Sequence, residues 1–388
     1  MNFDYSGSRT DVLFGRGRRD EAGELTARYG DEALVVTTRN AMQDAGFLDD
    51  VLTSLEGAGV NATVFEDVQP NPTVENVVDA ADAGGDADAV VALGGGSPMD
   101  VSKATAISLA TFDGTPTAEG IWGYVSGERS MQDALPVVAV PSTSGTGSHV
   151  DPWSVVTYTE ENAKVGFGGD VLVPRAAVVD PEIADEMPAS LTARTGFDAF
   201  CHLNESYVAK GADALTDAHA LRGMDLVNRH LRRSVEGSSG SRDAMAVADT
   251  LAGFCETTSG VVATHAVAHS ISAFGHDVAH GDALASVASE VARYNVENGD
   301  DETKRRYGEI AETLGAPIAD RKLDAHLVVD AVDELVADLG LQASVGELVD
   351  ASPQTLAENA VTYMGTALRN NPIEVDEEDV ADIIENAY

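Results

Sequence analysis

Short apolar runs alternate with amphipathic segments through the first half of the chain. Residues 33–37 (ALVVT), 87–93 (ADAVVAL) and 135–140 (LPVVAV) are continuous apolar runs, typical of strands buried on both faces. Further strands are predicted at 11–15 and 61–66, and helices at 19–29, 44–57 and 74–83. Strands that alternate with helices indicate a parallel sheet with crossover helices.

The second half has a different pattern. From about residue 182 onwards no segment resembles a strand, and Ala-rich segments are separated by Gly or Pro. Helices are predicted at 214–233, 241–255, 260–274, 283–298, 304–314, 323–339 and 353–370. The chain of 388 residues is long enough for two cores. We therefore predict an α/β domain over residues 1–182 and an all-helical domain over residues 183–388.

The apolar runs and the cysteine content narrow the class of protein. No apolar run approaches the roughly 18 residues of a membrane span, and no signal peptide is recognisable, which predicts a soluble, cytoplasmic protein. The two cysteines, Cys201 and Cys255, provide no disulfide framework.

Charge is the unusual feature of the composition. The chain carries 65 Asp and Glu against 24 Lys and Arg, for a formal net charge of −41. Such a surface repels nucleic acid and anionic membranes, which excludes both as partners. Acidic residues are spread along the whole chain, and this favours adaptation to high salt, because salt screens their mutual repulsion.

Two polar loops follow buried strands in the first half. Gly94, Gly95, Gly96 and Ser97 stand between a strand and a helix, where backbone N–H groups can bind a phosphate. The loop PSTSGTGSHVD (141–151) adds hydroxyl groups, including Ser142, Thr143 and Thr146. An ordinary Gly-rich turn would explain the first loop equally well. Together the loops favour a dinucleotide at the carboxyl ends of a parallel sheet.

The second half holds a cluster of histidines. His265 and His269 are spaced to lie on one face of a helix, and Asp198 and His202 have the same spacing. His280 follows after a Gly-containing break, so that it can return to the same point from a loop. Single histidines are more often surface or hydrogen-bonded core residues, but the joint pattern indicates a metal site between helices.

Five motifs resemble, in order, signatures of the iron-containing (group III) alcohol dehydrogenases: GGGSPMDVSKA, PSTSGTGSHV, VVDPEIADEMP, TGFDAFCHLNESYV and HAVAHSISAFGHDVAHG. The resemblance runs from about Phe14 to ALRNNPIEVDEEDV (367–380), nearly the whole chain. It implies an α/β, Rossmann-like N-terminal nucleotide-binding domain and an all-α C-terminal domain, the architecture of dehydroquinate synthase.

The resemblance also implies a metal centre. One divalent ion, Fe²⁺ or Zn²⁺, would be held by Asp198, His202, His265 and His280, with His276 as the alternative to His280. The ion would polarise an alcohol or carbonyl group. His269 matches the family position near the nicotinamide and is the candidate catalytic residue for orientation or proton relay.

Further positions match the cofactor site of the family, namely Asn71, Asp100, Lys103, Asp151 and Lys164. Two positions depart from the family pattern. Thr38 and Arg39 stand where an Asp commonly ends the early strand in relatives that use NAD, and His149 stands where a Glu is usual. Because Arg can pair with a 2′-phosphate, we expect NADP to be favoured over NAD.

The leading hypothesis is a metal-dependent, NAD(P)-dependent alcohol dehydrogenase or aldehyde reductase, acting on a small alcohol or aldehyde as a homo-oligomer, a dimer or larger. A maleylacetate-reductase-like enzyme without metal would not need Asp198 with three histidines. A dehydroquinate-synthase-type lyase would need a basic phosphate site, and this chain is poor in lysine. A non-catalytic binding protein would cause no substrate-dependent change in cofactor absorbance.

The net charge of −41 generates a prediction about salt. The Debye length falls from about 10 Å at 0.1 M salt to about 3 Å at 1 M, so that carboxylate repulsion weakens. The thermal midpoint of unfolding, followed by circular dichroism, should rise by several degrees over this range. An unchanged midpoint would contradict adaptation to high salt.

Overall fold

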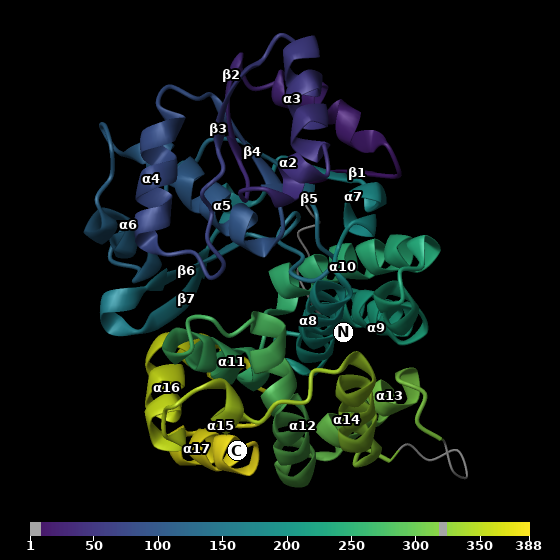
Figure 1. Cartoon of the computed structure of the whole chain (residues 1–388). Helices are drawn as coiled ribbons and strands as arrows, with labels where there is room; N and C mark the ends of the chain where they lie inside the picture. Colours follow the sequence, from purple (N-terminus) through teal and green to yellow (C-terminus); the bar gives the residue numbers. More distant parts are fainter. Residues whose placement is uncertain (1–8, 318–323) are drawn as a thin grey trace. The chain divides into compact units, whose positions relative to one another are not determined.

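The computed structural model describes residues 9–317 and 324–388, which form two compact units (Figure 1). The α/β unit contains the described residues up to Thr143 and then Ser148–Met187. The helical unit contains Ser144–Gly147 and the described residues from Pro188 to Tyr388. A loop of the first half of the chain therefore belongs to the helical unit.

A six-stranded sheet forms the centre of the α/β unit, in the order β1-β8-β5-β4-β2-β3. All of its strand pairs are parallel, which confirms the predicted parallel sheet. The strands are β1 (Asp11–Phe14), β2 (Glu32–Val36), β3 (Asn61–Phe65), β4 (Ala89–Gly94), β5 (Val137–Pro141) and β8 (Ala176–Val179).

Helices cover both faces of this sheet (Figure 1). Val35 and Val91 share one hydrophobic cluster with residues of α1 (Ala22–Thr26) and α3 (Phe47–Gly57). Neighbouring residues of a strand point to opposite faces, and Leu34 lies beside Gly84 of α4. The opposite face carries α4 (Val74–Gly84) and α5 (Gly96–Thr111). Burial on both faces explains the continuous apolar runs.

Other elements of this unit differ from the predicted pattern. The helix predicted at 44–57 is two helices, α2 (Ala41–Asp44) and α3, because Gly46 between them has a φ of 81°. The helix predicted at 19–29 is a 3₁₀ turn, η1 (Arg18–Glu21), followed by the short α1. Elements that the pattern did not predict are α6 (Ala118–Val125), β8, the antiparallel pair β6 (Trp153–Tyr158) and β7 (Ala163–Gly168), η2 (Thr159–Glu161), η3 (Asp170–Leu172) and α7 (Pro181–Asp185).

Every regular element in the described part of the helical unit is a helix, as predicted. They are α8 (Ala189–Val208), α9 (Ala214–Val235), α10 (Ser239–Ser259), α11 (Ala263–Phe274), α12 (His280–Asn298), α13 (Asp301–Thr313), α14 (Leu327–Leu339), α15 (Val345–Leu348), α16 (Pro353–Asn370) and α17 (Glu377–Asn386). The start predicted for α14, residue 323, lies outside the described residues.

Helix α8 is the central helix of this unit and packs against α9, α10 and α12. Its last three turns are buried, including the polar residues Asp198, His202 and Glu205. A buried helix with polar side chains needs partners for them inside the core. The candidate site supplies these partners.

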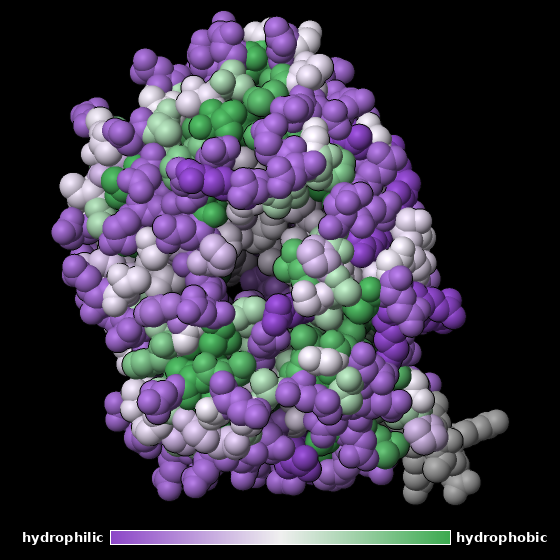
Figure 2. All heavy atoms as spheres, viewed as in Figure 1, coloured by the Kyte–Doolittle hydropathy of each residue, from purple (hydrophilic) through white to green (hydrophobic). Residues whose placement is uncertain are grey.

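The visible surface is mostly hydrophilic, with smaller hydrophobic areas (Figure 2). Among the described residues, no helix has both the length and the apolar character that a membrane crossing requires.

Candidate functional site

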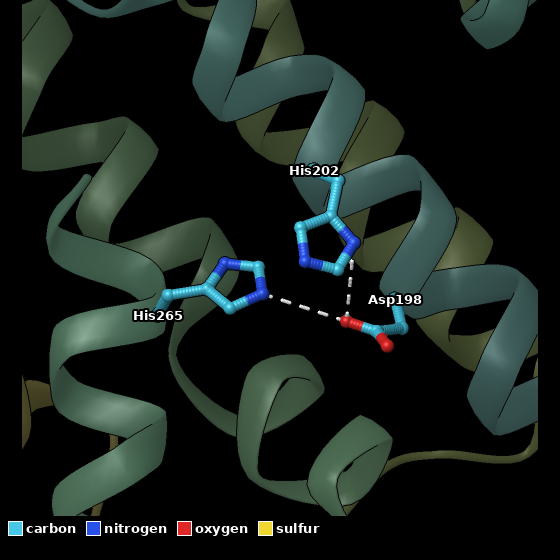
Figure 3. A group of neighbouring side chains, drawn as sticks. All are labelled: Asp198, His202 and His265. Atoms are coloured by element: carbon cyan, nitrogen blue, oxygen red, sulfur yellow. Dashed lines mark ion pairs between the residues drawn. The ribbon is translucent and has the colours of Figure 1, made fainter. Parts of the chain in front are cut away.

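Three helices of the helical unit bring together one carboxylate and three imidazoles. Asp198 and His202 lie one turn apart on α8, His265 lies on α11, and His280 is the first residue of α12. Figure 3 shows Asp198, His202 and His265 turned towards one another. One potential ligand atom of each of these three lies within 4.8 Å of the others.

Asp198 is the common neighbour of the three histidines. Its Oδ1 lies 3.5 Å from His265 Nε2, 3.6 Å from His202 Nδ1 and 3.8 Å from His280 Nε2. The side chain of His280 is 24% exposed, whereas that of Asp198 is 5% exposed. We expected His280 to return from a loop. It instead begins a helix, and the preceding break provides the turn in the chain.

The arrangement fits a divalent cation. Asp198 Oδ1 and His265 Nε2 are buried and make no hydrogen bond within the described part of the chain. Leaving such atoms unsatisfied costs about 1–3 kcal/mol each. One carboxylate and several imidazoles form a donor set that suits Fe²⁺ or Zn²⁺. A cation bound by these groups would give both Asp198 Oδ1 and His265 Nε2 a partner.

Glu205 holds His265 in place. Its Oε1 accepts a hydrogen bond from His265 Nδ1 at 2.6 Å, and its Oε2 accepts bonds from the backbone N–H groups of Val262 (2.6 Å) and His265 (3.3 Å). In the neutral ring the proton is then on Nδ1, and the lone pair of His265 is on Nε2, which faces Asp198. A carboxylate behind a ligand histidine commonly orients it for metal binding.

Glu205 was not among the site residues predicted from the sequence. Its spacing could have revealed it, because Glu205 lies two turns after Asp198 on the same face of α8. Burial lowers the pKa of His265, but the negative charges of Glu205 and Asp198 outweigh this effect and raise the pKa to about 10. Without a cation, this pKa keeps His265 protonated on both ring nitrogens, and a metal ion bound at Nε2 would displace the proton there.

His269 lies within the same histidine cluster, whereas His276 is set apart. The ring centroid of His269 is 5.3 Å from that of His280 and 6.3 Å from that of His265. His276 is exposed, before the start of α12. Among the described residues, the only group of potential metal ligands that meets the 4.8 Å distance is the one around Asp198.

In the α/β unit, several candidate cofactor residues lie at one edge of the sheet. Because β2, β4 and β5 are parallel neighbours, the loops that follow them meet at their carboxyl ends. Ser142 N donates to Gly94 O at 2.9 Å, and a Cβ on Gly95 would lie 2.9 Å from Thr143 Cγ2. Helix α5 begins at Gly96, with Ser97 in its first turn. Its N-terminus therefore faces the same edge.

Thr38 and Arg39 follow β2 at this edge. Thr38 pairs with Asp67, beyond the end of β3, in an isolated bridge. Arg39 forms an ion pair with Asp67 and lies 3.9 Å from Glu66. Its side chain is 61% exposed. The acidic partners of Arg39 thus come from the segment that follows β3, the strand next to β2.

Asn71 and Lys164 contact each other. Lys164 Nζ on β7 donates to Asn71 Oδ1 at 2.9 Å, and Asn71 has a positive φ of 49°. Asp100 of α5 accepts a bond from Val155 N at 3.0 Å, and burial raises its pKa to about 7.

Asp151 has a structural task in this unit. Its Oδ1 accepts bonds from the completely buried Lys103 Nζ (2.9 Å) and from Trp153 N (2.7 Å). His149 is also buried; burial and the positive charge of Lys103 lower its pKa to about 3, which keeps the ring neutral.

Thr146 belongs to the helical unit rather than to the sheet edge. Its two glycine neighbours are fixed there. Gly147 N donates to Asp249 Oδ1 of α10 at 2.7 Å, and Gly145 O accepts a bond from His202 Nδ1 at 3.2 Å. Thr146 is thus grouped with the helical unit, and Gly145 of the same loop contacts the candidate metal ligand His202.

Family models match nearly all of the chain. Residues 9–181 match the model described as iron-containing alcohol dehydrogenase, and residues 192–388 match the Fe-containing alcohol dehydrogenase family, C-terminal.

Known proteins show the same similarity. A 1,3-propanediol dehydrogenase of Citrobacter freundii is 34% identical over 92% of each chain, and a lactaldehyde reductase of Escherichia coli is 30% identical over 97% of each chain. The structure of an archaeal halo-thermophilic alcohol dehydrogenase from a Red Sea brine pool, bound to NZQ, matches with a TM-score of 0.94 and 38% identity. That match covers 100% of this chain and 99% of the other.

Substitution of the histidines tests the site. His202→Ala or His265→Ala should reduce bound metal to well below one ion per chain, because each change removes an imidazole beside Asp198. His276→Ala is the matched control and should retain the metal. Elemental analysis of the purified variants measures the content. Full occupancy in His265→Ala, or loss in His276→Ala, would contradict this ligand set.

Proposed function

The chain belongs to the iron-containing alcohol dehydrogenase family, and on this basis we propose that it is a metal-dependent, NAD(P)-dependent alcohol dehydrogenase or aldehyde reductase. The proposed reaction is hydride transfer between C4 of the nicotinamide and the carbon that bears the alcohol or carbonyl group of a small substrate. Family membership supports the coarser assignment, an oxidoreductase acting on CH–OH groups.

The observation that supports the metal proposal is that Asp198 Oδ1 lies within 3.8 Å of a ring nitrogen of His202, His265 and His280. Fe²⁺ or Zn²⁺ bound there would supply Lewis-acid polarisation of the substrate C–O group. The chain provides the orientation. Glu205 accepts a bond from His265 Nδ1, which leaves Nε2 of His265 for the metal. The Gly145 carbonyl accepts one from His202 Nδ1, the nitrogen nearer to Asp198, so that Nε2 would be the ligand atom of His202.

We propose that His269 orients the substrate or relays a proton. It is buried on α11, one turn after His265, and its ring lies 5.3 Å from that of His280. A buried imidazole can transfer a proton between its two nitrogens without a large movement of the chain. The metal ligands beside it would hold the reacting group nearby.

The start of α5 suits the pyrophosphate of a dinucleotide. Gly94 has a φ of 147°, a conformation that L side chains rarely adopt, and Gly95 lies close against Thr143. The N–H groups of the first turn and the positive end of the helix dipole favour a phosphate group there. Residues of the neighbouring loops, Ser142 and Thr143, can donate further hydrogen bonds.

The proposed preference for NADP depends on Arg39. Its pairs with Asp67 and Glu66 are largely exposed, and such pairs contribute about 0–1 kcal/mol. A charge-assisted bond to a 2′-phosphate is worth roughly 1.5–3 kcal/mol. The guanidinium should therefore exchange its carboxylate partners for the phosphate.

An activity panel tests the proposed function. Purified protein, loaded with Fe²⁺ or Zn²⁺ and kept at high salt, should oxidise alcohols or reduce aldehydes with a change in nicotinamide absorbance. Chelation should abolish the change and re-addition of the ion should restore it. Turnover that persists in the chelated protein would contradict the metal dependence, and no turnover with any substrate or cofactor would contradict the assignment.

Substitutions beside Arg39 test the cofactor preference. In wild type, kcat/KM should favour NADPH by about tenfold or more. Asp67→Asn should increase the ratio, because it removes a charge that repels the phosphate. The double change Thr38→Asp with Arg39→Ala should reverse the preference, so that kcat/KM is higher with NADH than with NADPH.

Glu56→Gln is the matched control, since it removes an exposed charge elsewhere in the same unit. The specificity argument fails if wild type prefers NADH, or if the double change leaves the ratio as it was.

A further inference from the structure

An ion pair joins the two helices that carry Asp198 and His280. Arg194 lies one turn before Asp198 on α8. Asp282 lies in the first turn of α12, the helix that begins with His280. Arg194 Nε donates to both carboxylate oxygens of Asp282, at 3.0 and 2.9 Å, and Arg194 Nη2 lies 2.9 Å from Asp282 Oδ2. Such a forked contact fixes the direction as well as the distance between the two side chains.

The backbones of the same two helices are in close contact at this point. Gly281 follows His280 and is buried. A Cβ on Gly281 would lie 2.5 Å from Arg194 O and 2.7 Å from Arg194 Cα, closer than such atoms approach in proteins. The missing side chain of glycine therefore lets α12 come this near to α8. Two independent contacts, one polar and one steric, hold the start of α12 against Arg194.

The position of His280 depends on these contacts. Two of the other candidate ligands lie well inside α8, and Glu205 holds His265. His280, by contrast, is the first residue of its helix and follows residues 275–279, which form no helix or strand. The first N–H groups of a helix have no partner within the helix, and helix ends fray. The first turn of α12 therefore needs its contacts with α8 to stay in place.

We propose that Arg194 is a positioning residue for His280. Through Asp282 it keeps the imidazole beside Asp198, where His280 Nε2 lies 3.8 Å from Asp198 Oδ1. This inference rests on the proposed metal dependence, and Arg194 itself does not bind the ion. Electrostatics alone would have the opposite effect, because a nearby guanidinium repels a cation and its removal would strengthen metal binding. A residue that acts through His280 should weaken metal binding when it is removed.

The test is the affinity of the full-length protein for Zn²⁺ and for Fe²⁺, measured anaerobically at high salt by competition with a chromophoric chelator. Arg194→Gln should weaken the binding of each ion that wild type binds by about tenfold. In a His280→Ala background the same change should cause no further loss, because the residue through which Arg194 acts is gone. Arg232→Gln is the matched control. It breaks a partly exposed pair with Asp338, between α9 and α14, and should bind both ions as wild type does.

Gly281→Ala is a second test that changes no charge. The new Cβ should push the start of α12 away from α8, and metal binding should weaken, again only while His280 is present. Arg194→Lys keeps the positive charge but loses the forked contact, so that its affinity should fall between those of wild type and Arg194→Gln.

The outcomes separate this inference from the proposed function. If wild type binds neither ion, the metal dependence fails, and the role of Arg194 fails with it. If wild type binds an ion and Arg194→Gln binds it equally or more tightly, only the role of Arg194 fails. A loss that persists in the His280→Ala background would indicate a general loosening of the helical unit and would also overturn the role. Should Arg194→Gln not fold, Arg194→Lys and Gly281→Ala provide the same comparison.

Discussion

Buried charge in the core of the helical unit is the constraint on which the candidate site depends. The carboxylate of Glu205 is completely buried, and removing an ion from water costs several kcal/mol. Two backbone N–H groups at the start of α11 and the ring N–H of His265 offset this cost. The same three bonds place α11 against α8 and direct His265 Nε2 towards Asp198. The hydrogen bonds that pack α11 against α8 are therefore also the ones that orient a candidate metal ligand.

The charged side chains at the surface are balanced differently from those in the core. Acidic residues outnumber basic ones by 65 to 24, so the basic side chains are too few to pair one-to-one with the acidic ones. Arginines that do pair often serve several acids at once, as Arg19 does with Asp50, Asp180 and Glu182. Inside the helical unit, by contrast, the buried carboxylate of Glu205 has defined partners in His265 and two backbone N–H groups. Salt screening acts on the charged surface, whereas specific hydrogen bonds hold this part of the core.

Patterns local in sequence predicted the fold well. The apolar runs at 33–37, 87–93 and 135–140 became buried strands, and the spacing of Asp198 and His202 placed both on one face of α8. Short or broken elements were not predicted. A strand of four residues, such as β8, is too short to show a clear hydrophobic pattern, and the positive φ of Gly46 divides a predicted helix into two.

Contacts between distant segments could not be predicted. Asp67 beside Arg39 depends on the register of β2 with β3, and Asp282 beside Arg194 depends on how α12 packs on α8. The sequence shows that Glu205 shares a face with Asp198, but only the packing of α11 shows what it binds. The assignment of roles to these residues remains a prediction from chemistry.

Anomalous diffraction tests the central claim most directly. Crystals of the protein loaded with Fe²⁺ or Zn²⁺ would be measured at the absorption edge of the metal. The account predicts one strong peak per chain within bonding distance of Asp198, His202, His265 and His280. A loaded crystal with no peak there, or with its peak at His276 or another group, would contradict it.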